Sequence, residues 1–117
     1  MNSLMPGIAL IVEDDALQRE LLTLLLKNEN MDVVQCDSVE AAELVLGRIG
    51  LELAVLVTDV KLAGQKSGLE LAAFAGEKFP KLRVVVVSGE GDIEVPDGTR
   101  FLRKPWQPLD LLREAIG

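Results

Sequence analysis

Histidine is absent from this chain of 117 residues, cysteine occurs once, and the aromatic residues are only three phenylalanines and one tryptophan. The missing histidine excludes His-based zinc sites and the Ser-His and Cys-His pairs of nucleophilic enzymes. With Cys36 as the lone cysteine, no disulfide can form within the chain. These enzyme and disulfide-rich classes are therefore excluded by composition.

Basic residues are outnumbered, with 12 Lys and Arg against 19 Asp and Glu and a net charge of -7. Because nucleic-acid affinity depends on clustered basic side chains, nucleic-acid binding is not expected. The longest apolar runs, 8–12 and 53–57, are far shorter than the stretch of about 20 residues that spans a bilayer. No basic residue precedes the first run, so a secretory signal is not expected and the predicted location is the cytoplasm.

Hydrophobic periodicity alternates between short β-branched runs and longer segments with apolar residues three and four positions apart. Five strands are predicted, at residues 8–12, 33–35, 55–58, 84–87 and 101–102. The first, third and fourth are apolar throughout, as in strands covered on both faces, so the second and fifth are expected at the sheet edges. The chain is expected to be one domain over 1–117, with a loose lead-in at 1–7.

The segments between these runs predict helices at 16–27, from 37 to about 48, from 67 to a point before Pro80, and at 109–116. The expected buried stripes are Leu17, Leu21, Leu24 and Leu25 in the first helix, Val39, Ala42, Leu44 and Leu46 in the second, Leu69, Leu71, Ala72 and Phe74 in the third, and Leu109, Leu112 and Ile116 in the last. Right-handed crossovers then give an α/β fold, a doubly wound parallel sheet in a three-layer sandwich.

Polar residues stand where the strands end. An acidic run, 13–15, follows the first strand, Asp59 follows the third, Ser88 the fourth and Lys104 the fifth. Because ligands bind at the carboxyl ends of the strands in such folds, these side chains are expected to lie together. Carboxylates from two adjacent strands repel one another, so a divalent cation that prefers oxygen ligands is expected between them, with Mg²⁺ the obvious candidate. Lys104 and Ser88 suit an anion beside that cation, and a phosphoryl group fits both.

This pattern resembles the receiver (REC) domains of two-component response regulators, in the CheY-like superfamily, over nearly the whole chain. The resemblance rests on the order and spacing of Val12-Glu13-Asp14-Asp15, Asp59, Ser88-Gly89 and Lys104-Pro105. It implies a flavodoxin-like sheet with strand order 2-1-3-4-5. The loop at 60–68 lacks the Met-Pro often found there and resembles the loop of receivers in hybrid histidine kinases.

The resemblance implies a metal site and a nucleophile. Asp59 would be the phosphoacceptor and would also bind Mg²⁺. Asp14 would bind the metal directly and Glu13 would bind it through water, while Lys61 would contribute its backbone carbonyl. A carboxylate is already ionised at neutral pH, so Asp59 needs no general base to act as a nucleophile. We read Asp15 as a residue of the first helical turn, not as a ligand.

Two further residues would contact the phosphoryl oxygens, the hydroxyl of Ser88 and the ammonium group of Lys104. By the same resemblance the Lys104-Pro105 peptide is expected to be cis. The family's switch residues would be Ser88 and Phe101, although a phenylalanine lacks the hydroxyl of the usual aromatic switch. Only eleven residues separate Gly89 from Phe101, too few for a full fourth helix with its loops, so that helix is expected to be shortened or missing.

The sequence therefore predicts a phosphoacceptor signalling domain, which catalyses only its own phosphorylation and dephosphorylation. The chain has no histidine, so the phosphoryl group would come from a histidine kinase or a histidine phosphotransfer protein, docked beside the first helix near Asp14 and Lys104. The downstream protein target is not identified by the sequence. The alternative is a receiver-like protein-binding module that signals without phosphorylation. A magnesium-dependent phosphohydrolase is disfavoured because Lys61 stands where a second acid is needed.

Overall fold

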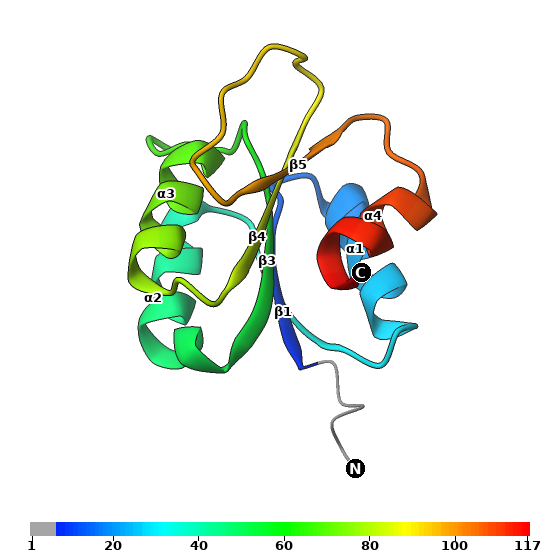
Figure 1. Cartoon of the computed structure of the whole chain (residues 1–117), viewed down its shortest axis with the longest axis horizontal. Helices are drawn as coiled ribbons and strands as arrows, with labels where there is room; N and C mark the ends of the chain where they lie inside the picture. Colours follow the sequence, from blue (N-terminus) through cyan, green and yellow to red (C-terminus); the bar gives the residue numbers. More distant parts are fainter. Residues whose placement is uncertain (1–6) are drawn as a thin grey trace.

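The computed structural model describes residues 7–117, so all but the last residue of the expected lead-in at 1–7 lies outside the described residues. Strands and helices alternate along the chain (Figure 1). The strands are β1 (Ile8–Val12), β2 (Asp32–Cys36), β3 (Leu53–Asp59), β4 (Arg83–Ser88) and β5 (Arg100–Arg103). The helices are α1 (Ala16–Lys27), α2 (Val39–Ile49), α3 (Gly68–Lys78) and α4 (Pro108–Ile116), and a 3-10 turn, η2 (Gly50–Glu52), precedes β3.

The strands form one parallel sheet in the order β2-β1-β3-β4-β5, which confirms the predicted flavodoxin-like topology and the two edge strands. The register aligns the strand ends. Val12 lies opposite Thr58, and Asp59 lies opposite Val87. The predicted site residues therefore lie at one edge of the sheet. They are the acidic run 13–15 after β1, Asp59 at the end of β3, Ser88 at the end of β4 and Lys104 after β5.

Two hydrophobic cores, one on each face of the sheet, hold the three layers together. Helices α2 and α3 cover one face, and α1 and α4 cover the other (Figure 1). Alternate residues of β1 supply both cores, with Leu10 facing α2 and α3 and Ile11 facing α1 and α4. The central strands are thus buried on both faces, as their uninterrupted apolar sequences indicate.

The predicted buried stripe of α1 is wrong at three of its four positions; the fourth, Leu25, packs against the core as a partly buried residue. Leu17, Leu21 and Leu24 are 80%, 49% and 52% exposed, whereas Leu22 and Leu26 are buried. Leucines occur on both faces of this helix, and the face that packs on the sheet is fixed by the Asp15 cap and the short link from β1. Helix α1 therefore exposes three leucines, among polar residues such as Gln18 and Glu20.

Three other helices carry smaller errors of the same kind. In α4 the buried residues are Leu111 and Ala115, while Leu109 and Ile116 are exposed. Leu44 of α2 and Phe74 of α3 were also expected in the core and are exposed. In α2 and α4 the buried residues stand three or four positions apart and face the sheet, and the exposed leucine does not fall on that spacing.

The connection between β4 and β5, residues 89–99, contains no helix, as predicted from its length. Its Ile93 and Val95 pack against the same core as Phe101 of β5, so the loop covers the sheet where a helix would otherwise lie. Gly98 has φ +81°, a backbone conformation that side chains other than glycine rarely adopt. Among residues 7–117, no helix is both long enough and apolar enough to cross a membrane.

Candidate functional site

Three carboxylates meet at the carboxyl edge of the sheet. One oxygen from each of Glu13, Asp14 and Asp59 lies within 4.8 Å of the others. Glu13 is 3% exposed, Asp14 is exposed and Asp59 is partly buried, so the cluster is reached from solvent on the Asp14 side. The structure thus brings together the two acidic segments that the sequence places after β1 and at the end of β3.

The pKa of Glu13 is raised from 4.5 to about 7, mainly by burial; a hydrogen bond from the Asp15 amide opposes the shift, and the nearby charge of Asp59 contributes to it. That amide donates to Glu13 Oε2 at 3.1 Å. The Asp15 side chain itself caps α1 by accepting from the Gln18 amide, so it is the helix cap and not a residue of the first turn. Asp15 lies outside the carboxylate cluster, as predicted.

Lys104 enters the cluster from the loop after β5. Its Nζ donates to Asp59 Oδ2 at 2.7 Å and lies 3.7 Å from Glu13 Oε1. Burial acts to lower the pKa of Lys104, but the hydrogen bond and charge of Asp59 outweigh it and raise this pKa. The Lys104-Pro105 peptide is cis, as the resemblance implies, and the Lys104 amide donates to the backbone carbonyl of Ser88 at 2.8 Å.

The backbone around Asp59 is fixed by close contacts. The Val60 amide donates to Asp59 Oδ1 at 2.8 Å. A β-carbon at Gly68, the first residue of α3, would overlap the backbone carbonyl of Asp59, so only glycine fits there. Ser67 and Glu70 form a capping box that starts α3 at this point. Helix α3 therefore begins against the backbone of Asp59.

Ser88 lies at the end of β4, buried, beside this cluster of strand ends. Its Oγ accepts a hydrogen bond from the Glu90 amide at 3.0 Å, which leaves the hydroxyl proton available for another acceptor. The Glu90 side chain pairs with Lys61 Nζ at 3.1 Å, and this pair joins the loops that follow β3 and β4. Phe101 lies on β5, half-buried, and packs against the core under α2 and α3.

Sequence reasoning missed one residue, Arg19 of α1. Its guanidinium donates to the backbone carbonyl of Glu13 at 2.7 Å and to the side-chain oxygen of Gln35 at 3.2 Å. In the sequence, Arg19 looks like a solvated residue on the outer side of a helix. No signal in the sequence identified this contact.

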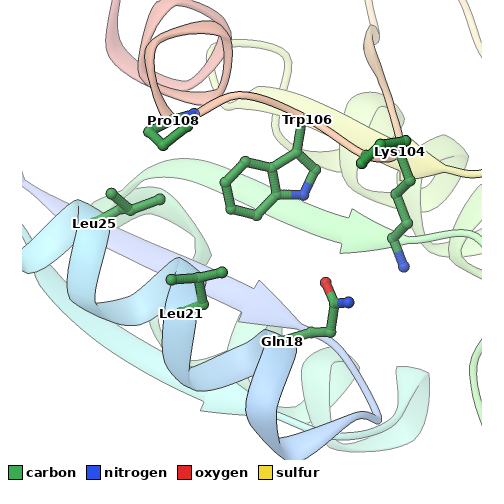
Figure 2. A pocket seen from close by; sticks show the side chains of 7 residues that line it. Gln18, Leu21, Leu25, Lys104, Trp106 and Pro108 are labelled. Atoms are coloured by element: carbon green, nitrogen blue, oxygen red, sulfur yellow. The ribbon is translucent and has the colours of Figure 1, made fainter.

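A groove of about 500 Å³ leads away from the site between α1 and the loop before α4. Figure 2 shows the Trp106 indole in this groove, with Leu21 and Leu25 of α1 across from it and Lys104 at one end. Trp106 is half-buried. The groove is mostly apolar, and its Lys104 end reaches the carboxylate cluster.

The chemistry of the donor set fits a hard divalent cation. Three carboxylates supply oxygen ligands, and Mg²⁺ and Ca²⁺ prefer such ligands. Lys104, which contacts two of these carboxylates, supplies a fixed positive charge on the other side. An anion that binds a cation and an ammonium group together, such as a phosphoryl group, would fit between them.

Sequence comparison relates the chain to known signalling proteins. A sequence model of the family described as the response regulator receiver domain matches residues 9–116. The chain is 31% identical over 116 residues to the transcriptional regulatory protein FixJ of Azorhizobium caulinodans, and the match covers 92% of this chain and 54% of FixJ. The chain spans about half the length of the curated relatives it matches.

Solved structures give the same relationship. The response regulator receiver protein from Pseudomonas putida is 30% identical, with a TM-score of 0.77, and the match covers 92% of this chain and 93% of that one. The receiver domain from the hybrid histidine kinase CckA is 26% identical, with a TM-score of 0.78, 92% of this chain covered and 94% of that one.

Proposed function

This chain belongs to the response regulator receiver domain family, and we propose that Asp59 is the residue that accepts its phosphoryl group. As a receiver, the chain is a phosphoacceptor domain of two-component signal transduction. The position of the Asp59 carboxylate is the main support for this assignment. The Asp59 carboxylate ends the central strand β3, forms part of the carboxylate cluster and accepts a 2.7 Å hydrogen bond from Lys104.

In the proposed reaction, an oxygen of Asp59 forms a bond to phosphorus while the bond from phosphorus to the donor nitrogen breaks. The electron pair of that bond remains on the donor imidazole. Negative charge on the transferring group must be balanced throughout, because phosphoryl transfer is driven by positioning and electrostatic stabilisation. Lys104 supplies a positive charge at 2.7 Å from the nucleophile, and the free hydroxyl proton of Ser88 supplies a hydrogen bond.

We propose that the resident metal is Mg²⁺, held directly by the carboxylates of Asp14 and Asp59 and by the backbone carbonyl of Lys61, with the Glu13 carboxylate bound to it through water. When bound, the metal neutralises the carboxylates and stabilises charge on the phosphoryl oxygens. The cluster geometry and the family both support this assignment. The later loss of the phosphoryl group is a hydrolysis. The oxygen of a water molecule attacks phosphorus, the bond to Asp59 breaks, and the carboxylate and free phosphate are released.

For the donor we propose a histidine kinase or a histidine phosphotransfer protein that docks on the groove beside α1. The groove ends at Lys104, so a helix seated there would bring its histidine to Asp59. The exposed leucines of α1, at positions 17, 21 and 24, extend this apolar surface. Replacing Trp106 with alanine should slow transfer from such a partner and leave phosphorylation by acetyl phosphate unchanged. The partner reaction is proposed to occur in the cytoplasm, and the downstream target is a protein of unknown identity.

The alternative, a receiver-like binding module that signals without phosphorylation, is not favoured. Such a module has no need for a buried carboxylate beside two others and a lysine, because this arrangement is costly without a charged ligand. Intact mass spectrometry with Mg²⁺ and acetyl phosphate distinguishes the two functions. We expect one phosphoryl adduct on the wild-type chain, dependent on Mg²⁺ and lost in Asp59→Asn. An unmodified wild-type chain under all these conditions would favour the binding module.

A further inference from the structure

We propose that Arg19 is a positioning residue for the metal-binding carboxylates, because it fixes the backbone that carries Glu13 and Asp14. The inference rests on the proposed magnesium site and adds to it a residue that binds neither metal nor phosphoryl group. Arg19 lies in the second turn of α1, where its own amide donates to the Asp15 carbonyl at 2.9 Å. Helix α1 therefore presents the guanidinium to the segment that precedes it.

The backbone of Glu13 is held by hydrogen bonds at both its amide and its carbonyl. Its amide donates to the Cys36 carbonyl at 3.0 Å, which ties it to the end of β2. Its carbonyl accepts from Arg19 Nη1 at 2.7 Å. The bond to Arg19 links this carbonyl to α1. With the backbone of Glu13 fixed in this way, the Glu13 side chain is directed inward and the Asp14 side chain toward solvent.

Arg19 makes its second contact with Gln35 of β2, whose side-chain oxygen accepts from Nε at 3.2 Å. The planar guanidinium offers several donors in a fixed fork, so it bonds two acceptors from two strand ends at once. The ammonium group of a lysine cannot reproduce this fork. The backbone of Arg19 has a further contact within the helix, where the Thr23 hydroxyl donates to the Arg19 carbonyl at 2.8 Å.

This restraint matters because the three carboxylates of the cluster repel one another before a cation binds. A looser segment 13–15 would let Glu13 and Asp14 move apart, and each binding event would then have to reorder them. Residues that orient metal ligands without binding the metal typically contribute about 10- to 100-fold to metal affinity. The positive charge of Arg19 has the opposite effect, since a cation near the site disfavours Mg²⁺ by simple repulsion.

These two effects differ in sign, so one substitution separates them. Arg19→Met removes both the charge and the hydrogen bonds and keeps a stem of similar shape. Loss of a nearby positive charge alone would tighten Mg²⁺ binding, whereas loss of positioning would weaken it. Arg19→Lys keeps the charge but not the fork, and Gln35→Leu keeps the bond to Glu13 but removes the second acceptor.

The experiment is a calorimetric titration of each folded variant with MgCl₂ at pH 8, with Arg48→Met as the control for removing an exposed arginine. We expect Mg²⁺ affinity to fall by about tenfold in Arg19→Met and less in Arg19→Lys and Gln35→Leu, with no loss in the control. Phosphorylation by acetyl phosphate should recover in Arg19→Met at saturating Mg²⁺, which a general structural defect would not allow.

Equal or tighter Mg²⁺ binding in Arg19→Met, with normal binding by the wild type, would overturn the positioning role and leave the proposed function intact. Absence of Mg²⁺ binding by the wild type would overturn the magnesium site and this inference together. A failure of the rate to recover at saturating Mg²⁺ would also contradict the inference, because positioning of the metal ligands predicts a defect in affinity alone.

Discussion

Lys104 and Asp59, 45 residues apart in sequence, are joined by a hydrogen bond of 2.7 Å across the carboxyl edge of the sheet. The two residues meet because β3, β4 and β5 are neighbouring parallel strands that end at the same edge of the sheet. The bond places a positive charge beside the proposed nucleophile before any phosphoryl donor arrives. This preorganisation is the basis of the first prediction.

Lys104→Met should slow phosphorylation of the chain by acetyl phosphate by about 100-fold, because one electrostatic contact to the transferring group is lost. Removal of a cation beside the carboxylates should leave Mg²⁺ binding at least as tight. The rate is measured by intact mass spectrometry at saturating Mg²⁺, with Lys81→Met, an exposed lysine, as the control. An unchanged rate in Lys104→Met would show that this contact does not stabilise the transfer.

The raised pKa of Glu13 predicts that Mg²⁺ binding depends on pH. Below its pKa of about 7 the Glu13 carboxyl is protonated, and the metal must displace that proton. Mg²⁺ affinity should therefore increase from pH 6 to pH 8 and level off above, with protons released on binding at pH 6. Calorimetry in two buffers of different ionisation enthalpy measures the release. Glu13→Gln should abolish the pH dependence, and an affinity equal at pH 6 and pH 8 in the wild type would contradict the prediction.

The same pKa has a consequence for the metal-free chain. Between pH 4.5 and about 7 the folded chain keeps the Glu13 proton, while the unfolded chain has lost it. The Glu13 contribution to the free energy of unfolding therefore falls as pH rises through this interval and is constant above it. Urea unfolding of the wild type and Glu13→Gln, compared at pH 5 and pH 7.5, measures this difference.

Gly68→Ala tests the contact behind Asp59. The new methyl group would overlap the Asp59 carbonyl, so α3 or the end of β3 must shift, and we expect a loss of about 1–3 kcal/mol in the free energy of unfolding. Gly76→Ala in the same helix is the matched control, since a β-carbon at Gly76 meets nothing within 4 Å. That variant should gain about 0.5–1 kcal/mol. Equal effects at the two glycines in urea unfolding would contradict the account.

Two leucines of α1 test which face of that helix is buried. Leu22→Ala should lower the free energy of unfolding by about 2–5 kcal/mol, because Leu22 is buried in the core under α1 and α4. Leu24→Ala should change it by less than about 0.5 kcal/mol, since Leu24 is 52% exposed. Comparable losses in both variants would mean that the outer face of α1 is covered in solution.

The division into central and edge strands and the carboxylate cluster were predictable from the residues themselves for one physical reason, whereas the full strand order was implied by the resemblance to receiver domains. A strand buried on both faces must be apolar throughout, so the first polar residue after it marks its end. Asp59 and Ser88 each end such a strand, and parallel pairing then places both at one edge. Local residue types therefore sufficed to locate the site.

Helix faces and long-range supporting contacts were not predictable in the same way. Helix α1 carries leucines on two faces, and its sequence pattern does not distinguish the face that packs on the sheet from the face left exposed. The contact of Arg19 with the Glu13 carbonyl, and that of Gly68 with the Asp59 carbonyl, involve backbone atoms. Such contacts leave no pattern of side-chain types in a single sequence.

The central claim is that Asp59 is the phosphoacceptor, and chemical trapping tests it most directly. The chain is phosphorylated with acetyl phosphate and Mg²⁺ and reduced with borohydride, which converts an aspartyl phosphate to homoserine, and the modified residue is then located by peptide mass spectrometry. We predict homoserine at position 59 alone, in a Mg²⁺-dependent yield. Homoserine at another acidic residue, Asp14 included, or none at position 59 in a phosphorylated chain, would contradict the account.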